Sequence, residues 1–116
     1  MKKRIAALLI VGMIFMSATM AEASVIPAPQ LSFSGTTANC IGQVAAPACY
    51  VTATLSLWQG NTELISWSQS GYHSIYIQES CDVAYGITYT LKLNGTINGV
   101  AFPEASVRRT NYEPNK

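Results

Sequence analysis

One stretch decides the fold of this chain, and it reads Val51-Thr52-Ala53-Thr54-Leu55-Ser56-Leu57-Trp58. Apolar side chains occupy every second position, and hydroxyls fill most of the gaps between them. This is the period of a β-strand that is buried on one face only. The same alternation returns at Tyr89-Thr90-Leu91-Lys92-Leu93-Asn94-Gly95-Thr96-Ile97. The sequence therefore predicts an all-β protein.

The stretch continues into a predicted hairpin, with strands over residues 49–59 and 64–68. Gly60-Asn61-Thr62 lies between them, and glycine and asparagine tolerate the positive φ that a turn needs. A two-residue loop would set Leu57 opposite Leu64. A three-residue loop would instead set Leu57 opposite Ile65, because a slip of one residue inverts every side chain.

The second register buries more apolar surface, since it turns Ile65 and Trp67 inward instead of Leu64 and Ser66. We therefore expect Trp67 in the core and Trp58 partly exposed.

The other expected strands are shorter and are separated by turn signals. A proline-rich arm, Val25-Ile26-Pro27-Ala28-Pro29, precedes them. We expect strands over residues 30–34, 36–44, 72–81, 87–97 and 105–110, with connections at residues 45–48, Ser70-Gly71 and Asn98-Gly99.

Short strands with turns every eight to twelve residues are typical of an antiparallel sandwich or barrel. A buried tryptophan in mid-chain, and Tyr89 following the Tyr85-Gly86 turn, favour an immunoglobulin-like or fibronectin-like sandwich of about seven strands. We assign residues 24–110 to this domain and residues 111–116 to a disordered tail.

The first 23 residues match a secretory signal peptide, which we expect to form a helix and to be removed. Met1-Lys2-Lys3-Arg4 is the basic head, residues 5–16 are apolar, and Ala21-Glu22-Ala23 is the cleavage site. The apolar run is shorter than the roughly 20 residues of a spanning helix. We expect a secreted, extracellular product with no membrane attachment after cleavage.

The charge of the exported part excludes some partners. Four basic side chains, Lys92, Arg108, Arg109 and Lys116, stand against five acidic ones, Glu63, Glu79, Asp82, Glu104 and Glu113, which gives a net charge of −1. These scattered cations form no basic face, so we expect no binding of nucleic acid.

Three cysteines, Cys40, Cys49 and Cys81, permit one disulfide outside the cell and leave one thiol over. In an immunoglobulin-like strand order the second strand runs antiparallel to the fifth, which brings Cys40 near Cys81. We therefore predict a bridge from Cys40 to Cys81, with Cys49 as the alternative partner of Cys40. Three cysteines without close pairs lack the spacing of a zinc site, so we expect no metal and no cofactor.

No arrangement of catalytic residues is visible. His73 is the single histidine and Asp82 the single aspartate, and no nucleophile motif accompanies them. Glu63 and Glu79 are the only carboxylates within the strand core, and Glu63 lies beside a turn. We predict that the protein is not an enzyme and has no catalytic residue.

Aromatic residues are the best candidates for a binding site. The alternation allows Tyr50, Trp58, Tyr72 and Tyr76 to face solvent near amide side chains. The simpler interpretation is that they cover the outer face of the sheet. Otherwise Trp58, Tyr72 and Tyr76 would bind a glycan or a protein, since rings supply contact area at low entropic cost. The alternative function is a small secreted antagonist, either antimicrobial or an inhibitor of a hydrolase.

Several short segments together resemble a known group of proteins. They are Ser34-Gly35-Thr36-Thr37-Ala38-Asn39-Cys40, Leu55-Ser56-Leu57-Trp58-Gln59-Gly60, Ser66-Trp67-Ser68, Gly86-Ile87-Thr88-Tyr89-Thr90-Leu91 and Gly95-Thr96-Ile97-Asn98-Gly99. The chain resembles short secreted immunoglobulin-like β-sandwich proteins of Gram-positive bacteria. That group has no established activity, so the resemblance implies the fold and export alone.

Overall fold

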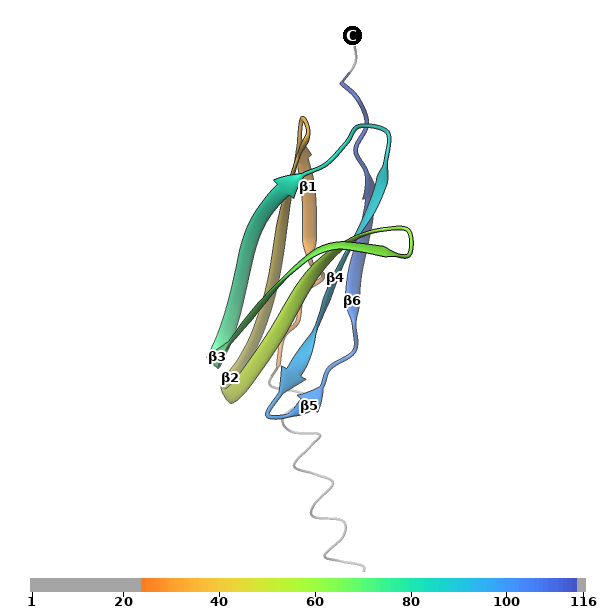
Figure 1. Cartoon of the computed structure of the whole chain (residues 1–116). Coiled ribbons are helices and arrows are strands. Elements are labelled where there is room, and N and C mark those ends of the chain that lie inside the picture. Colours follow the sequence, from red (N-terminus) through yellow and green to blue (C-terminus); the bar gives the residue numbers. More distant parts are fainter. Residues whose placement is uncertain (1–23, 115–116) are drawn as a thin grey trace, which may run out of the picture.

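The computed structural model describes residues 24–114, so the predicted signal peptide and the last two residues lie outside the described part. Six strands form one antiparallel sheet (Figure 1). No helix occurs between residues 24 and 114, which confirms the all-β class. The strands are β1 (Gln30–Ser34), β2 (Thr37–Gln59), β3 (Thr62–Asp82), β4 (Thr88–Ile97), β5 (Val100–Ala101) and β6 (Ala105–Thr110).

The break predicted at residues 45–48 is wrong, because β2 runs continuously from residue 37 to residue 59. The register of β2 against β3 is irregular between Ala46 and Tyr50, and Ala48 adopts a φ of 64°. Pro47 lies in this irregularity, where the missing N–H interrupts the ladder least. The strand bends here instead of ending.

The turn predicted at Ser70-Gly71 is also absent, since β3 is one strand of 21 residues. Ser70 pairs with Thr52 and Gly71 pairs with Val51. A long partner strand therefore supplies pairing that overrides the local turn signal.

The bent β2–β3 hairpin folds the sheet over on itself, as Figure 1 shows. Residues 37–46 of β2 pair with β1 and with residues 73–82 of β3, and we call these three segments the β1 layer. Residues 50–59 of β2 pair with residues 62–72 of β3 and with β4. These segments, with β5 and β6 beyond β4, make the β4 layer.

The two layers face one another across the core. A Cβ atom on Gly42, in the β1 layer, would lie 2.9 Å from Cδ1 of Leu55 and 3.2 Å from Cδ1 of Leu93, both in the β4 layer. Glycine at this position therefore leaves room for two leucines. The largest fully buried side chains are Leu55, Leu57, Leu91, Leu93, Val44, Val51 and Cys40.

The predicted pairing across the hairpin is confirmed, although the loop differs. Leu57 lies opposite Ile65. The loop has two residues, because Gln59 pairs with Thr62, and a bulge at Leu64 supplies the shift that we assigned to a longer loop.

Both tryptophans are partly buried. Trp58 is partly exposed, as predicted. Trp67 packs against the core but is only partly buried, so its prediction holds in part. Trp67 belongs to β3, which has a neighbouring strand on one side only.

The end of the domain lies one residue beyond its predicted limit. Asn111 is buried, and its Nδ2 donates hydrogen bonds to the carbonyl oxygens of Gly35 (3.0 Å) and Ala84 (3.2 Å). This side chain fastens the end of β6 to two turns, whereas the prediction placed residue 111 in the tail.

Candidate functional site

The bend in the hairpin presents two tyrosines and the histidine to solvent, and we call Tyr50, Tyr72 and His73 the aromatic corner. Tyr50 and Tyr72 are register partners on β2 and β3. Their ring centroids are 5.0 Å apart at an interplanar angle of 67°, an edge-to-face arrangement that aromatic pairs favour. Tyr72 is 68% exposed and Tyr50 is 41% exposed.

His73 and Ala48 fix the backbone of the bend. Both adopt a positive φ, 75° for His73 and 64° for Ala48, a conformation that L-residues rarely take. The backbone N–H of Ala48 donates a 3.0 Å hydrogen bond to Nδ1 of His73. Because Nδ1 accepts this bond, the proton of the neutral ring lies on Nε2. The imidazole thus stabilises the bend and keeps one donor free for a ligand.

Asn98 holds Tyr50 from the other side. The backbone N–H of Tyr50 donates to Oδ1 of Asn98 (2.8 Å), and the N–H of Asn98 donates to the carbonyl oxygen of Tyr50 (2.7 Å). Asn98 and Gly99 form the predicted tight hairpin, with Ile97 paired to Val100 and φ values of 50° and 82°. One asparagine therefore shapes a turn and anchors the corner.

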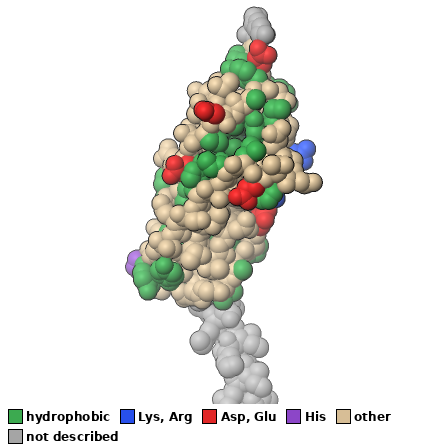
Figure 2. All heavy atoms as spheres, in the orientation of Figure 1, with side chains coloured by type: hydrophobic (Ala, Val, Ile, Leu, Met, Phe, Trp, Pro, Cys, Tyr) green, Lys and Arg blue, Asp and Glu red, His purple; other side chains and the backbone are tan. Residues whose placement is uncertain are grey.

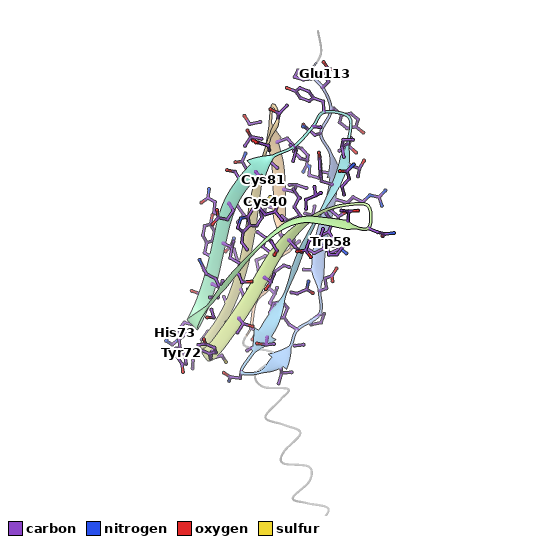
Figure 3. All side chains as sticks on the ribbon, viewed as in Figure 1. Cys40, Trp58, Tyr72, His73, Cys81 and Glu113 are labelled. Atoms are coloured by element: carbon purple, nitrogen blue, oxygen red, sulfur yellow. The ribbon has the colours of Figure 1, made fainter. Side chains whose placement is uncertain are left out.

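Figures 2 and 3 show the corner at one end of the molecule. In Figure 2 hydrophobic side chains gather beside the histidine at the lower left, and in Figure 3 Tyr72 and His73 lie together there. The centroids of these two rings are 6.5 Å apart. The corner thus offers apolar ring faces with polar atoms beside them.

The three residues predicted to bind ligand do not meet. Tyr72 lies in the corner, whereas Trp58 is eight positions from Tyr50 along β2, about 26 Å in an extended strand. Figure 3 shows Trp58 well apart from Tyr72. Tyr76 is 51% exposed on the other side of the bend, where it pairs with Gln43. A single platform of Trp58, Tyr72 and Tyr76 is therefore not formed.

Trp58 instead takes part in local contacts. Its Nε1 donates to Oγ of Ser56 (2.9 Å), and Nζ of Lys92 lies 4.1 Å from the ring centroid. The lysine covers the ring face that a ligand would need.

The structure places Cys40 and Cys81 on neighbouring antiparallel segments, side by side in Figure 3. Cys40 is the partner of Glu79 and Cys81 is the partner of Ala38, so the thiols are diagonal neighbours on one face. Diagonal Cβ atoms lie about 7 Å apart, beyond the roughly 4 Å of a disulfide. All three cysteines are free thiols here.

Burial sets the protonation of these thiols. Loss of solvation raises the pKa of Cys40 to about 12, and the nearby Cys81 adds to the rise. Loss of solvation also raises the pKa of Cys81, followed by the charge of Asp82. Both groups are therefore protonated and weakly nucleophilic at neutral pH.

The acidic residues do not form a site within residues 24–114. Glu63 and Glu79 are both exposed and lie on opposite sides of the bend in β3. No group of three histidine, cysteine, aspartate or glutamate side chains in this part of the chain could hold a metal ion. In the same part, no helix is long and apolar enough to span a membrane.

Sequence reasoning found Tyr72 but missed the contributions of Asn98 and His73. The Asn98-Gly99 turn was a visible signal, whereas the position of this turn beside Tyr50 follows from the pairing of β2 with β4. Comparison with known proteins adds no family to this picture, since no protein-family model and no curated protein matches the chain.

Proposed function

We propose that this protein is a secreted, non-enzymatic binding module whose aromatic corner docks an extracellular glycan or protein. The signal peptide at residues 1–23 would direct export and would then be cleaved. The observation that carries the proposal is the exposed Tyr50–Tyr72 pair, held edge to face at a bend of the backbone.

The corner has the properties that recognition requires. Two hydrogen bonds to Asn98 hold the backbone of Tyr50, and its ring packs edge to face on that of Tyr72, so both rings are already restrained before a ligand binds. The exposed ring faces suit the C–H faces of a sugar or an apolar side chain. The tyrosine hydroxyls and Nε2 of His73 add polar groups that can bond to hydroxyls or amides.

An immunoglobulin-like sandwich is the fold that we propose for this module. Two features support it: the two facing layers joined by the bent hairpin, and Tyr89. Tyr89 is buried near the start of β4, and its Oη accepts a 2.9 Å hydrogen bond from the N–H of Ala84, five residues upstream. A tyrosine bonded in this way is a hallmark of the immunoglobulin fold. The resemblance to secreted proteins of Gram-positive bacteria agrees with this proposal.

In an oxidising compartment we expect Cys40 and Cys81 to form the disulfide, with a small shift of the two strands. A disulfide oxidant would take up the two electrons and two protons. Cys49 is a poor alternative, because the extended residues between Cys40 and the bend separate the two thiols by roughly 20 Å. Peptide mapping of the exported protein without reduction would identify the bridge.

The test compares ligand binding by matched tyrosine variants. The wild-type protein is applied to a glycan array and used to capture extracellular proteins, and then Tyr50→Ala and Tyr72→Ala are compared with it. Each should weaken binding at least tenfold, since a buried aromatic anchor contributes about 2 kcal/mol. Tyr112→Ala is the control, because Tyr112 is 79% exposed near the C-terminus, away from the corner.

Two outcomes would overturn the proposal. One is the absence of any ligand on the array and in the capture experiment. The other is binding that Tyr112→Ala weakens as much as Tyr72→Ala does. If the purified protein inhibited growth, and if neither Tyr50→Ala nor Tyr72→Ala changed that inhibition, the result would favour the alternative function of a secreted antagonist.

A further inference from the structure

Within the described residues four strands, β1, β3, β5 and β6, have a neighbouring strand on one side only. Three of them are protected against pairing with another chain. β5 is two residues long and is followed by Pro103. β1 is five residues long and follows Pro27 and Pro29. β6 carries the exposed Arg108 and Arg109 and follows Pro103. Short strands, prolines and charges are the devices that keep sheet edges from pairing.

The remaining outer strand, β3, lacks prolines and charges over most of its first half. Within the described residues β3 pairs with β2 alone, so its other edge has no strand beside it. Residues 64–72 contain no charged side chain and no proline. The second half differs, because it carries the exposed carboxylates of Glu79 and Asp82.

The unprotected half also exposes apolar side chains. Leu64 is 44% exposed, Ile65 is 36% exposed, and Trp67 is partly buried. Ile65 and Trp67 lie opposite Leu57 and Leu55, which are fully buried. The inner face of β3 thus presents apolar surface that is partly exposed to solvent in the monomer.

We propose that residues 63–71 of β3 pair antiparallel with the same residues of a second copy, around a two-fold axis at Trp67. This register sets Ile65 opposite Gln69 of the second copy and Trp67 opposite its own equivalent. Glu63 then faces Gly71, so no carboxylate meets another. The proposal goes beyond ligand binding and leaves Tyr72 free.

A second copy is the occupant that this edge fits best. Each copy contributes the same strand, uncharged from residue 64 to residue 71, and the same partly exposed Ile65 and Trp67, so both gain backbone hydrogen bonds and aromatic contact. Because the protected outer strands β1, β5 and β6 do not pair, the association closes at a dimer and does not extend into a filament.

The contact is small. Nine paired residues bury less than the roughly 800 Å² per partner of a standard interface. We therefore expect a dissociation constant on the order of 100 μM.

Sedimentation equilibrium between about 5 μM and 1 mM tests the proposal. The wild-type mass should rise from monomer to dimer over this range. The double variant Ser66→Lys/Ser68→Lys places lysines opposite lysines across the axis and should weaken association at least tenfold. Ser32→Lys/Ser34→Lys on β1 is the matched control, with the same added charge on exposed positions, and should dimerise as the wild type does.

A fluorescence measurement keeps the test decisive if the lysine variant does not fold. In Trp58→Phe the remaining tryptophan is Trp67, whose emission should shift to shorter wavelength as the concentration rises. A monomeric wild type at 1 mM would overturn the proposal, as would a dimer that only the β1 variant disrupts. These readouts need no ligand, so they are independent of the binding proposed for the aromatic corner.

Discussion

β2 and β3 are the two strands of one hairpin and are almost equal in length, at 23 and 21 residues, yet they differ in environment. Between residues 51 and 58, β2 lies between β3 and β4, and its inward leucines have no exposed surface. β3 has β2 as its only strand neighbour among the described residues. Ile65 is 36% exposed although it is the direct partner of Leu57.

The difference shows that alternation predicts a strand without predicting how deeply it is buried. Burial depends on the strands to either side and on the layer opposite. In this molecule stability is expected to reside in β2 and β4, while recognition is expected to reside in β3 and at the bend. The variants below test this division.

The largest effect is expected from a methyl group placed between β2 and β4. A Cβ atom on Gly95 would collide with the carbonyl oxygen of Thr52 and would lie 2.9 Å from Cα of Ala53, and neither backbone atom can move aside. Gly95→Ala should lower the free energy of unfolding by about 3 kcal/mol or more.

Gly71→Ala is the matched variant in β3. Its Cβ would meet only Cδ1 of Ile75, at an ordinary 3.7 Å, so a change within about 0.5 kcal/mol is expected. Urea unfolding measures both. Equal losses in the two strands would contradict the proposed division.

The second effect compares the two partners of one cross-strand pair. Leu57→Ala removes a fully buried side chain and should cost about 3 kcal/mol. Ile65→Ala removes a side chain that is 36% exposed and should cost about 1 kcal/mol. If thermal or urea unfolding gave the larger loss for Ile65→Ala, β3 would have to be covered in solution.

The third effect compares two buried or partly buried thiols, Cys40 on β2 and Cys81 on β3. The pKa of Cys40 is raised by burial from 9.0 to about 12 in the folded protein. Its stabilising contribution is therefore complete below pH 9 and is lost as the pH rises towards 12, because the unfolded thiol ionises first. In the reduced protein the stability lost between neutral pH and pH 10 is on the order of 1 kcal/mol.

The free energy of unfolding is measured at pH 8 and pH 10 for the wild type and for Cys40→Ala. The difference between the two proteins separates the contribution of Cys40 from that of the tyrosines. The pKa of the partly buried Cys81 is also raised, by burial and by Asp82. Cys81 should nevertheless react faster than Cys40 with a thiol reagent, because it is more accessible. A faster reaction at Cys40 would mean that β2 is the more open strand.

The smallest effect concerns the lysine over Trp58. Lys92→Met should cost less than about 1 kcal/mol, because the cation–π contact lies at a partly exposed site. It should alter the fluorescence of Trp58, observed in a Trp67→Phe background, and leave that of Trp67 unchanged, observed in a Trp58→Phe background. An unchanged Trp58 signal would place Lys92 away from the ring in solution.

Local sequence patterns predicted several elements of the fold. Alternation identified the strands around Leu55 and Leu91, burial decided the Leu57–Ile65 register, and Asn98-Gly99 marked its hairpin. The strand breaks predicted at Pro47 and at Ser70 were wrong. Either residue ends a strand only where no long partner strand continues the pairing beyond it.

The candidate site was less predictable than the fold. Exposure of Tyr72 followed from its phase in the strand. The meeting of Tyr50, Tyr72 and Asn98 depends on a bend and on the pairing of β2 with β4, which join residues 22 and 48 positions apart in the sequence. Trp58 was predicted to bind ligand from its phase alone, and that phase gave no sign of Lys92, which lies over the ring from another strand.

Hydrogen exchange of backbone amides in about 5 μM protein tests the contrast between β2 and β3 most directly. At this concentration the proposed dimer is dissociated, so each strand reports its own neighbours. We predict that amides of residues 51–58 exchange slowly at every position, while about half of those in residues 63–71 exchange fast. Equally slow exchange throughout both segments would contradict the account, because β3 would then have a second neighbour that this fold does not provide.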